Sequence, residues 1–449
     1  MPVIRFSALV AFAMAALGEA AAADRPNIVV IIGDDMGYAD VGFHGCRDIP
    51  TPNLDALAAS GVRFTNGYVT GPYCSPTRAG IATGRHQTRF GHEFNAGGKG
   101  TGLPLTEGTL ADRLRAVGYK TAAIGKWHLG EEAPYHPQRR GYDEFFGFLG
   151  GAHDYFDVKG VLRGSAPLQR NETEYLTDAI ARESVAFIET NRSRPFFLYM
   201  AFNAVHTPMQ ADDARLMKFA SIQDKQRRTY AAMMFALDEA VGRVVQKLAS
   251  SNLTDNTLVV FFSDNGGPTM PGTTVNGSSN APLRGSKRTT LEGGVRVPFV
   301  MSWPGKIAAG KVYDPLVIQL DAHATALAAA GIAAKPEWKL DGVDLAPYLT
   351  GQKTGTPHDT LYWRFGQQMA IRHGDWKLVR YDTAADGEKP GVTAAKLYNL
   401  KDDIGESKDL IATHPEKARE LKAKWDAWNE SNVDPLWGGG RRKNASGAQ

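Results

Sequence analysis

The segment covering residues 72–85 contains side chains that suit a nucleophile placed beside a bound anion. It begins PYCSPTR, with Cys74, Pro76 and Arg78 at alternate positions. Proline fits the first turn of a helix, so the sequence predicts Cys74 at a helix N-terminus, where backbone N–H groups and the dipole favour an anion. Arg78 can donate two parallel hydrogen bonds to a tetrahedral oxyanion. The segment therefore predicts a nucleophile at an anion-binding site.

Two apolar runs each end in oxygen-bearing side chains, which are Asp34, Asp35, Asp264 and Asn265. Carboxylate and amide oxygens suit a hard cation such as Ca²⁺ or Mg²⁺ rather than a soft metal. The alternative is that these residues form ordinary turns at strand ends, because Asp, Asn and Gly favour turns. Their joint occurrence favours a metal site, which we expect at an exposed end of the strands.

Strands and helices alternate over the first two thirds of the chain. Continuous apolar runs predict strands buried on both faces, at residues 27–32, 121–124, 196–202 and 258–262. Helical periodicity or helix-boundary residues predict helices at residues 51–61, 110–118 and 234–248. This alternation predicts an α/β fold with a large, mostly parallel sheet between two layers of helices.

The polar clusters should meet at one edge of that sheet. Besides the two acidic pairs, the second strand leads to Lys126 and His128, and the third leads to His206. Ligands of open α/β sheets bind beyond the carboxyl ends of the strands, so we expect these side chains to share one cleft.

The texture of the chain changes after about residue 351. Short runs at residues 361–365, 369–372 and 376–381 predict an antiparallel sheet, and residues 415–429 predict an amphipathic helix. We therefore expect a catalytic domain at residues 24–351, a C-terminal α+β subdomain at 352–437, and a disordered tail at 438–449.

The N-terminal segment bears on export, and the net charge bears on partners. Residues 1–23 combine Arg5, an apolar run and a small-residue cleavage site, which is typical of a secretory signal peptide. We therefore expect an exported protein, periplasmic or extracellular, with no membrane span. A net charge of +3 gives no reason to expect nucleic acid as a partner. A disulfide between Cys46 and Cys74 stays open as an alternative role for the only two cysteines.

The Cys-x-Pro-x-Arg motif at Cys74 resembles the signature of the sulfatases, including its trailing Thr-Gly-Arg. Other motifs follow in the order found in that family: Asp-Asp, Gly-Lys-Trp-His-Leu-Gly, His-Thr-Pro, Asp-Asn-Gly-Gly and Arg-Gly-Ser-Lys. The match runs from residue 26 to about residue 300. On these motifs the chain is identified as a member of the formylglycine-dependent sulfatases, which share the alkaline-phosphatase-like fold.

The resemblance implies how the site works. Cys74 would be oxidised to Cα-formylglycine by a formylglycine-generating enzyme, and a hydroxyl of the hydrated aldehyde would attack sulfur. One cation, Ca²⁺ or alternatively Mg²⁺, would be held by residue 74 together with Asp34, Asp35, Asp264 and Asn265.

The resemblance also assigns roles to the basic residues. Arg78 would steady the nucleophile and the metal site, and Lys126 and Lys287 would hold sulfate oxygens. His206 would protonate the leaving alcohol, with Lys287 as a possible helper. His128 would remove the proton whose loss expels sulfate.

The substrate is the least determined feature. The motif GGAHDYF at residues 150–156 resembles a substrate-facing loop of carbohydrate sulfatases, in which His153 and Asp154 would contact sugar hydroxyls; an ordinary loop is the alternative. A sulfated glycan or an aryl sulfate is therefore the expected substrate. Two rival functions stay open: a phosphate-ester hydrolase with the same fold, and a non-catalytic protein that binds sulfated glycans.

Overall fold

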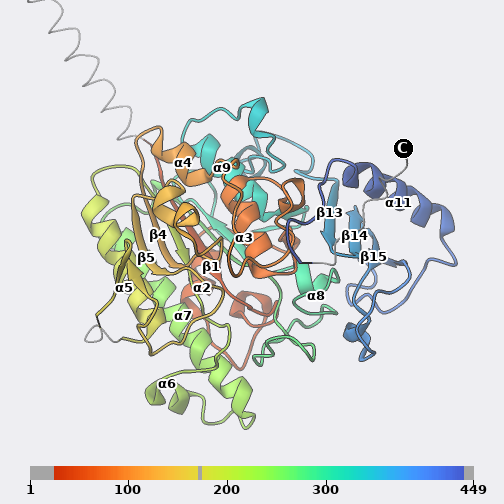
Figure 1. Ribbon diagram of the computed structural model, residues 1–449, viewed down its shortest axis with the longest axis horizontal. Coiled ribbons are helices and arrows are strands. Elements are labelled where there is room, and N and C mark those ends of the chain that lie inside the picture. The colour runs from red at the N-terminus through yellow and green to blue at the C-terminus, as the bar shows by residue number, and fades with distance from the viewer. Residues whose placement is uncertain (1–24, 170–173, 439–449) are drawn as a thin grey trace, which may run out of the picture.

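A ten-stranded sheet forms the centre of the protein (Figure 1), as seen in a computed structural model that describes residues 25–169 and 174–438. Its strand order is β11-β2-β10-β9-β1-β8-β4-β5-β6-β7. The four strands at its centre run parallel to one another: β9 (Thr257–Ser263), β1 (Asn27–Gly33), β8 (Phe196–Ala201) and β4 (Lys120–Lys126). The predicted α/β fold is confirmed.

The remaining strands extend the sheet on both sides. β5 (Glu144–Phe148) continues the parallel part, whereas β10 (Phe299–Ser302) pairs antiparallel with β9. The outer strands are β2 (Val62–Phe64), β11 (Lys311–Tyr313), β6 (Leu162–Arg163) and β7 (Ala166–Pro167). A separate pair is formed by β3 (Gly67–Tyr68) and β12 (Val317–Ile318).

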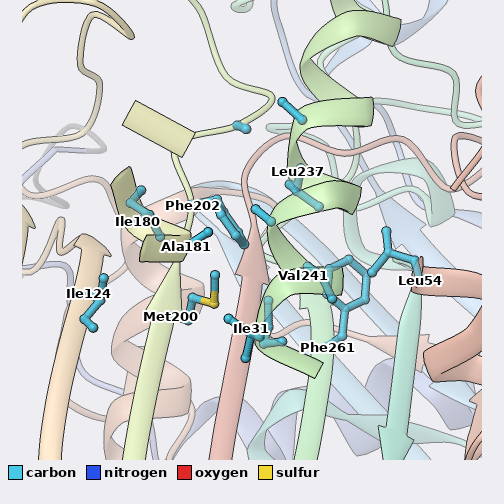
Figure 2. Packing of buried hydrophobic residues seen from close by; sticks show 14 of the residues in the cluster. Ile31, Leu54, Ile124, Ile180, Ala181, Met200, Phe202, Leu237, Val241 and Phe261 are labelled. Atoms are coloured by element: carbon cyan, nitrogen blue, oxygen red, sulfur yellow. The ribbon is translucent and has the colours of Figure 1, made fainter. Parts of the chain in front are cut away.

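Every residue of β1 is buried. Since successive side chains of a strand point to opposite sides, both faces of this strand are covered. Ile31 and its neighbours pack against Leu54, Ile180 and Leu237 (Figure 2). The helices on this face are α2 (Pro52–Ala59), α5 (Leu176–Asn191) and α7 (Lys225–Ser250), with the short α6 (Asp213–Lys218) packed on α7.

The opposite face of the sheet is covered by a second set of helices. Ile28, Val30 and Ile32 belong to an apolar cluster that includes Ile81 and Leu110. These helices are α3 (Cys74–Thr83), α4 (Leu110–Arg115) and α9 (Gln319–Ala329), and further short helices are α8 (Glu292–Val295) and α10 (Ala346–Leu349). The two layers of helices predicted from the sequence are therefore present.

A smaller antiparallel sheet lies beside the large one, on the right of Figure 1. Its strands are β13 (Thr360–Phe365), β14 (Gln368–His373), β15 (Trp376–Arg380) and β16 (Lys396–Asn399), and α11 (Pro415–Asn429) packs on β14 and β15. The sequence predicts the first three strands and the helix within two residues. The subdomain boundary near residue 352 stays a prediction. The predicted signal peptide at residues 1–23, and the predicted tail at residues 438–449 except for its first residue, lie outside the described residues.

Buried charges join the small sheet to the large domain in an arrangement that we call the interface cluster: Glu292, Glu406, Lys377, Arg296 and Arg372. The Lys377 ammonium lies 2.8 Å from one oxygen of Glu292 and 2.9 Å from one of Glu406. The other Glu292 oxygen accepts a hydrogen bond from Tyr68 at 2.6 Å, and the other Glu406 oxygen accepts one from the Glu292 backbone at 2.7 Å. Every carboxylate oxygen of this cluster thus faces a donor or cation.

Among the described residues, no helix combines the length and the apolar composition that a membrane crossing requires.

Candidate active site

The register of the large sheet brings the two acidic pairs together. Gly33 at the end of β1 lies opposite Ser263 at the end of β9, so Asp34-Asp35 and Asp264-Asn265 emerge side by side. The Asp35 backbone N–H donates to the Asp264 carboxylate at 3.3 Å. The Asn265 side chain donates to the Asp35 carboxylate at 2.7 Å. All four side chains are fully buried.

This burial contradicts the expected exposed strand end. The side chains of Asp34 and Asp264 are 0% exposed, because α3 and the loop between β9 and α8 cover the end of the sheet. Carboxylates that have lost their water need cations or hydrogen-bond donors in its place. The site is therefore a buried charge cluster rather than an open turn.

Cys74 is the first residue of α3, as the motif predicts. Tyr73 is the N-cap, with extended backbone and no side-chain cap hydrogen bond, and the Ser75 backbone N–H in the first turn donates to the Asn95 side chain at 3.1 Å. The Cys74 sulfur lies 3.6 Å from an oxygen of Asp34. Cys46 and Cys74 are both free, so the alternative of a disulfide between them is not what the structure forms.

Four side chains offer ligand atoms at this point. One atom each from Asp34, Asp35, Cys74 and His206 lie within 4.8 Å of one another. The Asn265 side-chain oxygen is buried and finds no hydrogen-bond partner among the described residues. Burial and the adjacent Asp34 carboxylate raise the pKa of Asp264 to about 6. An orphaned amide oxygen beside crowded carboxylates fits a hard cation held by Asp34, Asp35, Asp264 and Asn265.

Three basic side chains neutralise the acidic pairs. Arg78 donates two hydrogen bonds to one Asp264 oxygen, at 3.0 and 2.8 Å. Lys126 lies 2.5 Å from Asp34, and Lys287 lies 2.8 Å from Asp35. We call these six charged residues, with Cys74 and Asn265, the site cluster.

The pKa values in the site cluster follow from burial and from these pairs. Burial alone would raise the pKa of Asp34, but the charges of Lys126, His206 and Arg78 outweigh it and hold the pKa below its ordinary value. Burial lowers the pKa of Lys287, but Asp35 outweighs this effect, so Lys287 stays charged. Burial, reinforced by Asp264, raises the pKa of the Cys74 thiol far above its usual range. An unmodified Cys74 is thus a neutral thiol and a poor nucleophile near pH 7.

The two histidines approach from different strands. His206 follows β8, and hydrogen bonds that join Asp34 to Ala204 and Val205 extend the sheet pairing toward it. Its Nδ1 lies 2.7 Å from the Thr207 carbonyl, and its Nε2 lies 3.6 Å from Asp35. Burial lowers the pKa of His206, and Asp35 partly opposes that shift.

His128 follows β4 and adopts a left-handed backbone conformation, with φ of 57°. Burial, together with the charge of Lys126, lowers the pKa of its imidazole well below the ordinary value. Its backbone carbonyl accepts a hydrogen bond from the Ser75 hydroxyl at 2.7 Å, which ties it to the residue after Cys74. The sequence-predicted convergence therefore includes both histidines.

His153 and Asp154 make their polar contacts within their own loop and with a neighbouring segment. The His153 ring nitrogens face the carbonyls of Asp154 and Lys159, at 2.7 and 2.9 Å. The Asp154 carboxylate accepts from the Phe156 backbone at 2.8 Å and from the Gln210 side chain at 2.6 Å. Contact with a sugar stays a prediction for both residues.

Several supporting residues escape a motif-based analysis. Thr274 donates to Asp35 at 3.1 Å, and the Asn276 side chain donates to the backbone carbonyls of Asp35 and Val205, at 3.1 and 2.9 Å. In the sequence, Thr274 and Asn276 lie in the polar run between the Asp-Asn-Gly-Gly and Arg-Gly-Ser-Lys motifs, and this run is the feature that could have indicated them. The Tyr155 hydroxyl, which bonds the backbone at His206, lies in the loop that the sequence associates with substrate.

The fold and this site define a sulfatase, a hydrolase of sulfate esters, and the chain belongs to the sulfatase family. The family model for sulfatases matches residues 26–332, and the model for the C-terminal region of N-sulphoglucosamine sulphohydrolase matches residues 285–429. The formylglycine nucleophile and a divalent cation are general features of this family.

Individual relatives agree with the family assignment. N-acetylgalactosamine-6-sulfatase of Canis lupus familiaris is 35% identical over 396 residues, which cover 82% of this chain and 74% of the relative. Arylsulfatase A of Bos taurus is 35% identical over 471 residues, which cover 91% of this chain and 89% of the relative. The solved structure of Ps i-CgsB in complex with k-i-k-neocarrahexaose is 36% identical, with a TM-score of 0.85 over 92% of this chain and 94% of that one.

Proposed function

We propose that this sulfatase hydrolyses sulfate monoesters of carbohydrates, using a formylglycine made from Cys74 and one divalent cation, Ca²⁺ in preference to Mg²⁺. The observation that carries the proposal is the position of Cys74: its sulfur stands at the start of α3, within 4.8 Å of ligand atoms from Asp34, Asp35 and His206. A nucleophile, hard-cation ligands and an acid are thus available to one sulfate group.

The described side chains divide the remaining work. When bound, the cation supplies positive charge to the sulfate, and formylglycine supplies the attacking hydroxyl. Lys126 and Lys287 each carry three N–H donors, so both can hold a sulfate oxygen while keeping their carboxylate partners. Arg78 is fixed on Asp264 and keeps that carboxylate oriented.

Proton transfer falls to the two histidines. The Thr207 carbonyl accepts from Nδ1 of His206, which leaves Nε2 to donate a proton to the departing alcohol oxygen. Asp35, 3.6 Å away, favours the protonated ring that this role needs. His128, whose pKa is lowered by burial, is neutral near pH 7 and can accept a proton from residue 74 as sulfate departs.

The carbohydrate class is supported by the relatives. Their names include N-acetylgalactosamine-6-sulfatase, and the related Ps i-CgsB was solved with k-i-k-neocarrahexaose, an oligosaccharide by its name. His153 and Asp154 are proposed to stand near the sugar. We further propose export through residues 1–23, and maturation by a formylglycine-generating enzyme.

The mass of the peptide that contains residue 74 tests the nucleophile. Active enzyme should carry an aldehyde in place of the thiol, and Cys74→Ala should fold and lose more than about 10⁴-fold in kcat/KM. Cys46→Ser is the matched control and should keep both the modification and the activity. A fully active protein with an unmodified thiol would refute the proposal.

A second measurement separates sulfatase from phosphatase. Sulfate and phosphate esters of one phenol present the same leaving group, so their kcat/KM ratio reports the preference for the transferred group. We expect sulfate to be preferred, and release of sulfate from a panel of sulfated glycans then identifies the sugar. A preference for phosphate would favour the rival hydrolase. Tight binding of sulfated glycans without turnover would favour the non-catalytic rival.

A further inference from the structure

The loop at residues 150–156, between β5 and β6, contacts both histidines of the site. Its sequence resembles a substrate-facing loop, yet the side chains of His153 and Asp154 make their hydrogen bonds to other residues of the protein. Two of its members, Gly151 and Tyr155, instead lie against His128 and against the backbone at His206. Neither of these two contacts requires a sugar.

Tyr155 is buried, with 1% of its surface exposed, and its ring stacks on Tyr175. Its hydroxyl lies 2.7 Å from the Asn203 carbonyl and 2.8 Å from the His206 carbonyl. The Asn203 carbonyl also accepts the His206 backbone N–H, at 2.8 Å. One phenolic proton thus ties both carbonyls of the turn that carries His206.

The loop is also fastened to the segment that follows His206. The Gln210 side chain accepts a hydrogen bond from the Tyr155 backbone at 2.9 Å and donates one to Asp154 at 2.6 Å. Tyr175 donates to the Gln210 backbone carbonyl at 2.9 Å. These bonds fix the position of Tyr155 beside the turn that carries His206.

Gly151 makes a different kind of contact. A methyl group placed on its Cα would lie 2.6 Å from Nε2 of His128 and 2.7 Å from Cε1, and the three nearest atoms all belong to that ring. The His128 backbone N–H is held by the Leu149 carbonyl at 3.0 Å, so the same connection sets the backbone and the ring. Only glycine at position 151 leaves room for the imidazole where it stands.

We propose that the 150–156 loop positions both proton-transfer groups, with Tyr155 setting His206 and Gly151 setting His128. The inference rests on the proposed function, in which His206 protonates the leaving alcohol and His128 accepts a proton as sulfate departs. Displacement of a proton-transfer group by a fraction of an ångström slows the step that it serves. The two residues should therefore affect two different steps.

Tyr155→Phe tests the acid side of the loop. A poor alkyl leaving group needs the proton from His206, whereas an activated nitrophenyl leaving group needs it little. We expect kcat/KM to fall about 10–100-fold on an alkyl sulfate and less than about threefold on 4-nitrophenyl sulfate. Tyr119→Phe is the matched control, because it removes a buried tyrosine hydroxyl that donates to the Pro26 carbonyl at 2.8 Å, before β1 and outside the His206 turn, and it should show no such difference.

Gly151→Ala tests the base side. If the displaced His128 slows only the release of sulfate, 4-nitrophenyl sulfate should give a rapid burst of nitrophenol equal to the enzyme concentration, followed by slow turnover. Gly150→Ala is the matched control, since the nearest atom to its new methyl group would be a Glu131 oxygen at 3.7 Å, an ordinary contact. It should behave like the unchanged enzyme.

The outcomes separate the inference from the function on which it rests. If the unchanged enzyme releases sulfate but Tyr155→Phe slows both esters equally, or Gly151→Ala matches Gly150→Ala, the positioning role is wrong. A Tyr155→Phe protein that does not fold leaves Gly151→Ala to decide, because its new methyl group meets the His128 ring first. An unchanged enzyme that releases sulfate from neither ester and from no sulfated glycan refutes the proposed function itself.

Discussion

The site cluster and the interface cluster are both groups of buried charge, yet they are closed to different degrees. In the interface cluster, Lys377 lies between Glu292 and Glu406, and each carboxylate oxygen faces a donor or cation. In the site cluster, one Asp34 oxygen faces only the weak thiol donor of Cys74 at 3.6 Å among its described contacts. The Asn265 side-chain oxygen has no partner in the part of the chain that the structure describes.

This difference separates a structural cluster from a functional one. Burying a charge costs free energy unless donors or opposite charges replace the lost water. The interface cluster meets that condition with its own residues, and its contacts hold two parts of the chain together. The site cluster leaves one Asp34 oxygen and the Asn265 side-chain oxygen without a strong donor or a cation among the described residues. Carboxylate and amide oxygens of this kind are ligands that suit a hard cation.

Among the changes that compare the two clusters, the largest effect is expected where the site cluster loses the proposed metal ligand Asp264. Asp264→Asn keeps the shape of the side chain and one acceptor for Arg78 but removes a charge. We expect the metal content to fall and kcat/KM to drop more than about 100-fold. For the unchanged protein, Ca²⁺ at about 100 times its Kd should stabilise the fold by about 2.7 kcal/mol relative to chelator, and the variant should lose that gain.

Asp238→Asn is the control for this experiment. Asp238 is also fully buried, but its carboxylate accepts from Asn53 and Leu54 at the start of α2, away from the site cluster. It should lower stability without changing the response of Tm to Ca²⁺. An Asp264→Asn protein that binds Ca²⁺ and hydrolyses sulfate esters at the normal rate would mean that Asp264 is not a ligand of the cation.

The contrast also shows what the sequence could reveal. Asp34, Asp264 and Lys126 stand at the ends of apolar runs, and parallel pairing places such ends together, so their convergence was predictable. The interface cluster was not, because Glu292, Lys377 and Glu406 belong to segments without a shared motif. Their contact depends on how the small sheet docks, which local periodicity does not encode.

Burial was the other feature that the sequence could not supply. An acidic pair at a strand end has the same composition whether water or protein covers it, and here α3 and the loop before α8 cover it. Likewise, the motif at residues 150–156 indicates a loop near the site. It does not indicate that Tyr155 turns its hydroxyl inward to the His206 turn, because this depends on packing against Tyr175.

A smaller effect, on stability alone, is expected from the interface cluster. Lys377→Met removes the cation between two buried carboxylates, which should lower the free energy of unfolding by about 3–5 kcal/mol. Urea unfolding measures the loss, and kcat of the folded protein should stay within about twofold. Lys401→Met, at an exposed lysine after β16, is the control and should change stability by less than about 0.5 kcal/mol. A large fall in kcat with unchanged stability would show that the cluster serves the site.

The smallest effect concerns the pH dependence of the same cluster. Burial, reinforced by Glu292, raises the pKa of Glu406 to about 7 in the folded protein, against an ordinary value of 4.5, although Lys377 opposes the shift. A carboxyl with a raised pKa binds its proton more tightly when folded, so its contribution to stability is fully present below about pH 4.5 and is lost as pH rises through about 7.

Glu406→Gln has no proton to lose, so its unfolding free energy should decline less between these values, by about 1–3 kcal/mol. The measurement is urea unfolding at a series of pH values, with Glu430→Gln, at an exposed glutamate, as the control. Parallel curves for Glu406→Gln and the unchanged protein would mean that Lys377 keeps both carboxylates ionised, and the interface cluster would then be as fully paired in charge as it is in geometry.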